Sequence, residues 1–109
     1  MMQIEDVWEE WKQTVNMTAR ELEHWLETDR SKVVGELRFG AESTGHEAAR
    51  KIAKILRKRK DDLNDDDLDH IREVVAFVKA HLARRPRGDI RETRWRYVLM
   101  NWGHDPLKS

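Results

Sequence analysis

The stretch LNDDDLDHIREVVAFVKAHLARRP, residues 63–86, decides the fold class of this sequence. Asn64 is a typical N-cap residue, and three Asp follow it where their negative charge suits the positive end of the helix macrodipole. Leu63 and Leu68 are placed to pack on each other as a hydrophobic staple. A pair of arginines and then a proline close the pattern at its C-terminal end. We therefore predict a helix from Asn64 to about Arg85.

Helical signals continue on the N-terminal side of this stretch. Apolar residues from Ile4 to Val15 recur at spacings of three and four, which predicts an amphipathic helix that ends near Asn16. Thr18 and Glu21 then form a capping box, in which each side chain can bond the backbone N–H of the other residue. A second helix is therefore expected to begin directly after the first.

Two further capping boxes divide the rest of the chain. Residues 29–44 carry two glycines in a mostly polar stretch, which predicts a loop. Thr44, with a Glu three residues later, opens a helix to about Lys60. Asp89, again with a Glu three residues later, opens a last helix that ends at Gly103, the expected left-handed stop.

These elements predict an all-α fold in a single compact domain of about five helices, residues 1–109. No alternating β-branched run or hairpin turn indicates a strand. Charged residues make up 39% of the chain, yet five Trp and many aliphatic residues recur at helical spacing, which argues against disorder. We expect the first, second and last helices, which carry the Trp residues, to seal a core around the other two.

Composition excludes several classes of function. The chain has no Cys, which excludes a disulfide framework, a thiolate nucleophile and a Cys-based metal site. No apolar run approaches the ~20 residues that a membrane span needs, and the acidic N-terminus does not resemble a signal peptide. We therefore expect a cytoplasmic protein with no membrane partner.

Charge is segregated along the chain, although 21 basic and 21 acidic residues give a net charge of zero. Residues 50–60 carry seven bases and no acid, and residues 61–69 carry six Asp. Helical geometry places five of these bases within an arc of about 120°. They are Arg50, Lys51, Lys54, Arg57 and Lys58. Such a face is suited to DNA or RNA phosphates, but it is equally typical of a solvated helix whose bases pair with the neighbouring Asp run, or of a protein contact.

The C-terminal part offers a second basic surface. Trp95 and Trp102 share one face of the last helix and are expected in the core. The opposite face carries a ridge whose side chains suit phosphate contact, base stacking and hydrogen bonding to base edges. The ridge consists of Arg94, Tyr97 and Asn101, with Arg96 and Met100 beside it. Upstream, the sequence adds Arg84, Arg85, Arg87 and Arg91.

Metal binding and catalysis are not favoured by the residue spacing. His70 and His81 fall on one stripe of a helix but about 16 Å apart, so they cannot share one ion. The other histidines have no second ligand at helical spacing apart from acids that are common throughout the chain. Capping explains Thr44 and its partner in the stretch ESTGHE, residues 42–47. We expect no catalytic residue, no metal and no cofactor.

Several motifs together resemble a known family. They are VNMT at 15–18, ESTGH at 42–46, KRK at 58–60, HLA at 81–83 and LMNWGHDPLK at 99–108. On these motifs the chain resembles the small uncharacterised helical proteins grouped as Domain of Unknown Function 3140. Some members are labelled DNA-binding, so the resemblance implies a binding role without implying particular site residues. Arg94 and Val98 depart from the residues that similar sequences carry at those positions.

The leading hypothesis is therefore nucleic-acid binding, with DNA favoured over RNA, through the basic helix face and the arginines from 84 to 96. The alternative is a non-enzymatic adaptor that binds a second copy or another protein through loop 29–44, through the surface around Tyr97 and Met100, or on an uncovered apolar side of helix 64–85. Helix ending does not account for Tyr97, Asn101, His104 and Asp105. A function of the C-terminal tail is expected at those residues.

Overall fold

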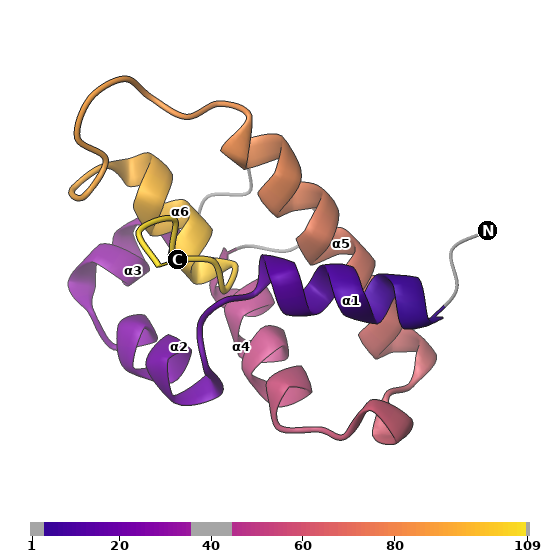
Figure 1. Ribbon diagram of the computed structural model, residues 1–109. Helices are drawn as coiled ribbons and strands as arrows, with labels where there is room; N and C mark the ends of the chain where they lie inside the picture. The colour runs from indigo at the N-terminus through magenta and orange to yellow at the C-terminus, as the bar shows by residue number, and fades with distance from the viewer. Residues whose placement is uncertain (1–3, 36–44, 109) are drawn as a thin grey trace.

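The computed structural model describes residues 4–35 and 45–108, which fold into six α-helices and one short 3-10 helix (Figure 1). The helices are α1 Ile4–Thr14, α2 Ala19–Leu26, α3 Asp29–Gly35, α4 Gly45–Leu56, the 3-10 helix η1 Lys60–Asp62, α5 Asp65–Leu82 and α6 Arg94–Asn101. None of the residues in these two ranges lies in a strand, so the predicted all-α class is confirmed. Within the same ranges, no helix has the length and apolar character to cross a bilayer.

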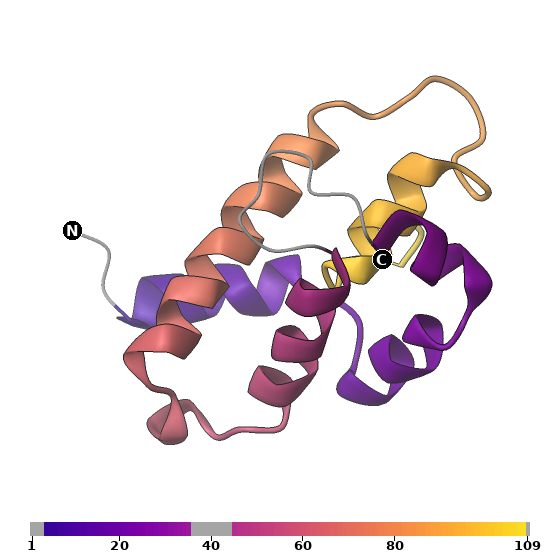
Figure 2. The ribbon, with the colours of Figure 1, turned by 180° about the vertical axis from the view of Figure 1, so that it is seen from behind.

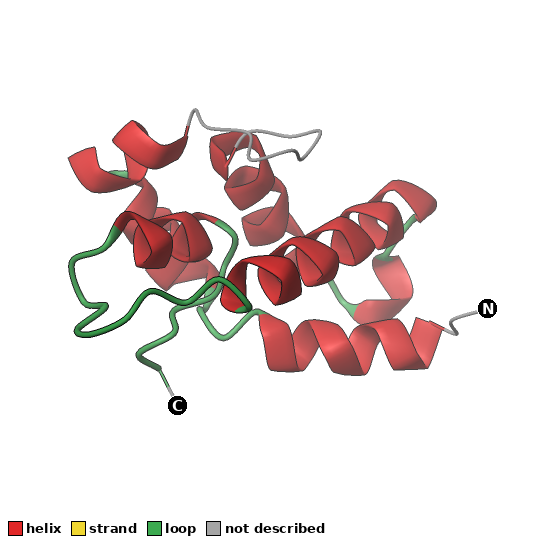
Figure 3. Cartoon of the chain, turned by 90° about the horizontal axis from the view of Figure 1, so that it is seen from above, coloured by secondary structure: helices red, strands yellow, loops and turns green. Residues whose placement is uncertain are grey.

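Helix α5 is the longest element, and it begins as its sequence predicts. The Asn64 side chain accepts a hydrogen bond from the Asp67 N–H at 2.8 Å, and the Asp67 carboxylate accepts one from the Asn64 N–H at 3.1 Å. The apolar side of the helix packs into the core, with Ile71 and Val74 at 0% exposure and Leu68, Phe77 and Leu82 half-buried. Helix α1 packs against α5 on one side and α4 packs on another (Figure 3).

The remaining helices form the other half of the molecule around α4. Helix α4 contacts α2, α3, α5 and α6, so it lies at the centre of the helix packing (Figure 2). Its Ala48, Ala49 and Ile52 side chains are completely buried. As expected, Trp95 and Trp102 are also in the core, with 8% and 1% exposure.

Helix α3 corrects the prediction of a loop over residues 29–44. The Thr28 hydroxyl accepts a hydrogen bond from the Ser31 N–H at 3.2 Å, as an N-cap residue does. Ser31 and Val34 then fall on one face and are buried against the core. The rest of the predicted loop, 36–44, and the expected Thr44 cap lie outside the described residues.

Two helix boundaries also differ from prediction. Helix α4 ends at Leu56, so Arg57 and Lys58 lie beyond its last turn. Helix α6 begins at Arg94 because Thr93, rather than Asp89, is its N-cap, with its hydroxyl accepting from the Arg96 N–H at 3.2 Å. The connection 83–93 between α5 and α6 is therefore longer than predicted.

Candidate nucleic-acid interface

The five cations predicted on one helix face divide into two groups. Arg50, Lys51 and Lys54 lie on the exposed side of α4, and the described residues offer none of them an ion-pair partner within 4 Å. Arg57 and Lys58, in the turn after the helix, are both paired with acids. The predicted basic face is therefore only partly available to a ligand.

The Arg57 pair links the turn after α4 to α2, and the Lys58 pair links this turn to α5. The Arg57 guanidinium donates two hydrogen bonds to the Glu23 carboxylate, at 2.7 and 3.0 Å. The Lys58 ammonium donates to Asp67 at 2.6 Å, and this bond is the main reason why the pKa of Asp67 lies below its ordinary value of 3.8. The Asp run next to the basic helix thus does pair with one of its bases.

The unpaired cations of α4 also face carboxylates. A groove of about 490 Å³ between α4 and α5 has Lys51 and Lys54 on one wall and Asp66, Asp69 and Glu73 on the other. A second groove, of about 280 Å³ between α2 and α4, holds Arg50 near Glu23. These acids oppose the approach of a phosphate to the same face.

The connection between α5 and α6 carries cations in a different setting. We define the arginine segment as residues 84–94. Four of its arginines are exposed and have no ion-pair partner among the described residues: Arg84, Arg85, Arg87 and Arg94. The Arg85 guanidinium carbon lies 5.7 Å from the centre of the Trp95 ring, a cation–π contact. Pro86 and Gly88, with φ of +85° at the glycine, turn the chain back toward α6.

The arginine segment and the Asp run lie at opposite ends of α5 (Figure 1). The 18 residues of this helix span about 27 Å. At physiological ionic strength the Debye length is only about 8 Å, so the Asp charges hardly reach the arginine segment. The basic face of α4 and the arginine segment are therefore electrostatically different surfaces.

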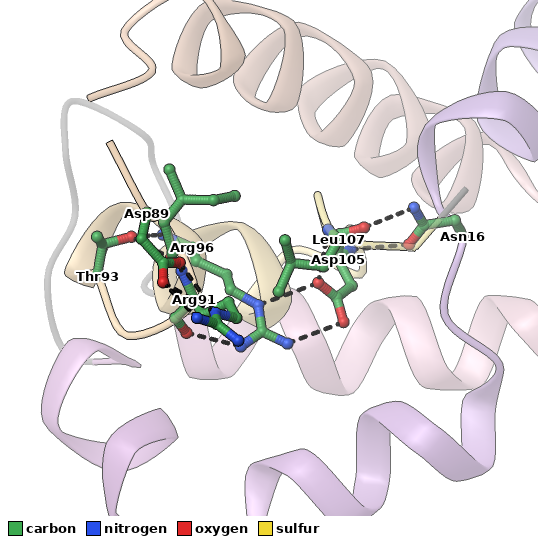
Figure 4. Close-up of polar contacts among 8 residues, drawn as sticks. Asn16, Asp89, Arg91, Thr93, Arg96, Asp105 and Leu107 are labelled. Atoms are coloured by element: carbon green, nitrogen blue, oxygen red, sulfur yellow. Dashed lines mark hydrogen bonds and ion pairs between the residues drawn. The ribbon is translucent and has the colours of Figure 1, made fainter. Parts of the chain in front are cut away.

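Two arginines of the predicted surface are bound internally (Figure 4). Arg91 donates three hydrogen bonds to the Asp89 carboxylate, at 2.6 to 3.0 Å, and these bonds lower the pKa of Asp89 to about 2. Arg96 donates to the Asp105 carboxylate at 3.1 and 3.2 Å and to the Arg91 carbonyl at 2.7 Å. Arg96 therefore connects both ends of α6 and is not free to contact a ligand.

The predicted ridge on α6 is wrong at Asn101, which is completely buried. Its Oδ1 accepts hydrogen bonds from the Trp25 indole N–H at 2.6 Å and from the Ser31 hydroxyl at 2.7 Å, and its Nδ2 donates to the Ser31 carbonyl at 3.1 Å. Met100 is buried as well, at 9% exposure, whereas Tyr97 is half-buried against the Trp25 ring. Asn101 thus holds α2, α3 and α6 together and cannot read a base.

The C-terminal tail is bonded to the connection between α1 and α2. The Gly103 carbonyl accepts from the N–H groups of Asn16 and Met17, and Asn16 exchanges two hydrogen bonds with the Asp105 backbone at 2.8 and 2.9 Å. The His104 ring donates from Nδ1 to the Thr14 carbonyl at 2.7 Å. Asn101, His104 and Asp105, which are not needed to end the helix, therefore all form structural hydrogen bonds, and Tyr97 packs on Trp25.

Gly103 is the left-handed stop that the sequence predicts. Its φ is +80°, and the hydrogen bonds from the Gly103 N–H to Met100 and from the His104 N–H to Leu99 form a Schellman motif. A Cβ at Gly103 would lie 3.0 Å from Cγ1 of Val15, so this position also needs glycine for space.

His70 lines the groove between α4 and α5 together with Glu73. Its Nε2 lies 3.2 Å from the Ala48 carbonyl and therefore carries the proton, while Nδ1 lies 3.5 Å from a Glu73 oxygen. Burial is the main reason why the pKa of His70 lies below 6.5. In the part of the chain that the structure describes, no three His, Cys, Asp or Glu side chains are grouped as metal ligands. His70 and His81 share α5 but not a site.

The pairs Arg57–Glu23 and Arg96–Asp105, 34 and 9 residues apart, have no signal in the sequence pattern, and they decide which of these cations remain available. Comparison with curated proteins found no match, and neither did comparison with solved structures. A family model described as a protein of unknown function matches residues 10–100, which is most of the chain. The chain therefore belongs to the DUF3140 family.

Proposed function

We propose that this protein binds DNA through the phosphate backbone and that the arginine segment is the primary contact. The single observation that supports this proposal best is the exposure of Arg84, Arg85, Arg87 and Arg94, none of which has an ion-pair partner among the described residues. Guanidinium groups bond phosphate oxygens in a bidentate manner. For this role we also propose a cytoplasmic location.

The basic face of α4 has a secondary role in this proposal. Its cations share their grooves with Asp66, Asp69 and Glu23, which weakens their attraction for phosphate. Beyond the far end of α5 the arginine segment contains two acids, and each has a cationic partner: Asp89 bonds Arg91, and a Glu92 oxygen lies 3.7 Å from Arg30. DNA is therefore expected to approach the molecule from the side of the arginine segment.

Fluorescence anisotropy with a short labelled duplex tests the proposal. Four phosphate contacts predict that affinity falls about 150-fold between about 50 and about 200 mM salt, since log K falls by about 0.9 per contact for each unit of log salt. The variant Arg84→Gln/Arg85→Gln/Arg87→Gln should lose most of this binding and most of its salt dependence. Absence of binding by the unsubstituted protein at about 50 mM salt contradicts the proposal.

A matched control has the same change of net charge elsewhere. It replaces exposed cations of α1, α2 and α5 that lie outside the arginine segment, as Lys12→Gln/Arg20→Gln/Arg72→Gln. This control should bind DNA like the unsubstituted protein. An equal loss in both variants would mean that total charge, rather than the arginine segment, determines binding.

The adaptor hypothesis retains one supporting observation. A groove of about 460 Å³ beside α2 has Met17, Trp25 and Met100 among its lining residues. The expectation of an uncovered apolar side on helix 64–85 is wrong, because α5 exposes no large hydrophobic side chain. Sedimentation that shows a strict monomer would remove a dimeric adaptor from consideration.

A further inference from the structure

The aromatic rings nearest to the arginine segment are already covered by other side chains. Trp95 is 8% exposed, with Arg85 over its ring and the His81 ring stacked on it at a centroid distance of 6.2 Å. Its indole N–H donates to the His81 carbonyl at 2.7 Å. A nucleic-acid base would have to displace these contacts before it could stack on Trp95.

Tyr97, the other aromatic residue of α6, is covered in a similar way. The Arg30 guanidinium carbon lies 5.5 Å from the centre of its ring, and the Trp25 ring lies 5.6 Å from it. Proteins that bind single strands gain about 1–3 kcal/mol for each base that stacks on an exposed aromatic side chain. The surroundings of Trp95 and Tyr97 offer no such open platform.

Burial of α6 also prevents the helix from reading bases. Five of its eight residues are buried, from Trp95 through Val98 to Asn101, because four other helices pack around it. A recognition helix must instead present one continuous face to the major groove. The arginines therefore meet nucleic acid from the ends of helices and from the 83–93 connection, where they can reach phosphates but not base edges.

The arginines are distributed along a turn rather than along one helix stripe. Arg84 and Arg85 follow α5, Arg87 lies in the turn, and Arg94 begins α6. Figure 1 shows this connection as an open arc that leaves α5 and returns to α6. A duplex carries one phosphate charge per ~1.7 Å of axis, twice the linear density of a single strand, so it offers more phosphates to such an arc.

We infer that the arginine segment recognises duplex DNA by its phosphate backbone alone, independently of sequence and without stacking a base. This inference rests on the proposed function and specifies the form of DNA that the protein binds. Arg85 leaves Trp95 for a phosphate or contacts one from its place over the ring, and Trp95 stays in the core.

Competition anisotropy tests this inference with the unsubstituted protein. A labelled duplex is displaced by unlabelled AT-rich duplex, GC-rich duplex or oligothymidine, which cannot pair with itself. The slope of log K against log salt is about 0.9 per phosphate contact for duplex and about 0.7 for a single strand. With four contacts, we therefore expect duplex to compete roughly tenfold better than oligothymidine at about 50 mM salt. The two duplexes should compete within about threefold of each other, since phosphate contacts carry no sequence information.

The outcomes separate this inference from the proposed function. Oligothymidine that competes as well as duplex, or one duplex sequence that competes more than about tenfold better than the other, overturns the inference alone. No binding of any DNA overturns the proposed function and the inference with it. The variant Tyr97→Leu adds a direct test of stacking: duplex affinity should stay within about twofold, and a large loss in a folded variant overturns the inference.

Discussion

The two ends of α6 both carry polar residues that the sequence offers as ligand contacts, and they differ in what surrounds these residues. At the N-terminal end, Arg84, Arg85, Arg87 and Arg94 are exposed; of the two carboxylates in this segment, Asp89 is bound by Arg91 and Glu92 lies 3.7 Å from Arg30. At the C-terminal end, Asn101 is buried and His104 and Asp105 are bonded to the connection between α1 and α2. Polar residue type alone therefore does not separate a ligand surface from a structural junction.

The difference has a physical cause in the packing of a short helix. The N-terminus of α6 follows an 11-residue connection that is mostly exposed and is anchored in the core by Ile90, whereas its C-terminus lies among α2, α3 and α4. Buried polar groups must be hydrogen-bonded, since an unsatisfied one costs about 1–3 kcal/mol. Substitutions at the C-terminal end should therefore change stability, and substitutions at the N-terminal end should change DNA binding.

The largest effect is expected for Asn101→Leu. Its side chain bonds Trp25 and Ser31, so the substitution removes three hydrogen bonds from a buried junction of α2, α3 and α6. The free energy of unfolding should fall by about 3 kcal/mol or more in urea denaturation. Arg94→Gln, at the exposed start of the same helix, should change it by less than about 0.5 kcal/mol. Equal effects of the two substitutions would contradict the contrast between the helix ends.

Two glycines allow the same contrast to be drawn for backbone conformation. Gly88 and Gly103 both have positive φ, +85° and +80°. A Cβ at Gly88 meets nothing within 4 Å, whereas at Gly103 it lies 3.0 Å from Val15 and 3.3 Å from Ile52. Gly88→Ala should therefore destabilise the protein by about 1 kcal/mol, the conformational term alone, and Gly103→Ala by about 2 kcal/mol or more. Thermal denaturation of both variants would show whether the steric term exists.

A third comparison concerns Asp105 and Asp89, which bind arginines at the two ends of α6. Burial alone would raise the pKa of Asp105, but hydrogen bonds from Arg96 and from the Leu107 N–H outweigh it and hold the pKa below 3.8. Its contribution is therefore present above pH 3.8 and is lost as the pH falls through the folded-state pKa. Asp105→Asn should reduce the free energy of unfolding by about 1–2 kcal/mol at neutral pH.

The control for this prediction is Asp89→Asn, at the other end of α6. Asp89 is fully exposed, so water screens its pair with Arg91 and the substitution should leave stability at neutral pH unchanged. The difference between Asp105→Asn and the unsubstituted protein should shrink as the pH is lowered below 3.8. A difference that persists unchanged in acid would mean that the Asp105 charge does not contribute.

The local signals in the sequence were sufficient for much of the fold. The capping box at Thr18 and the N-cap at Asn64 form as predicted, and Gly103 ends α6 in the expected conformation. These features depend on residues three to five apart, whose relative positions a helix determines. Helix α3 was missed because the N-cap Thr28 precedes only seven helical residues, too few for a periodic apolar pattern.

The candidate site was predicted less well, since its availability depends on distant contacts. Arg57 pairs with Glu23, 34 residues away, and Asn101 bonds Trp25, 76 residues away. The prediction of an exposed ridge on α6 assumed that an amphipathic helix buries one face only. Other helices pack around α6, so its polar side at Asn101 is buried too, and no periodicity in α6 itself could indicate this.

The smallest expected effect concerns two arginines: Arg87, which lies beyond the C-terminal end of α5, and Arg72, which lies inside α5. Arg87→Gln removes an exposed cation that has no ion-pair partner among the described residues, whereas Arg72→Gln removes one that pairs with Asp69 near the acidic end. Both change the net charge equally. Loss of one phosphate contact should reduce the slope of log K against log salt by about 0.9 for Arg87→Gln. Arg72→Gln should leave the slope unchanged in anisotropy titrations over the same salt range, because its charge lies far from the arc that meets the duplex. Equal slopes for the two variants would mean that DNA binds elsewhere on the molecule. The exposed arginines before α6 would then have no role in DNA binding.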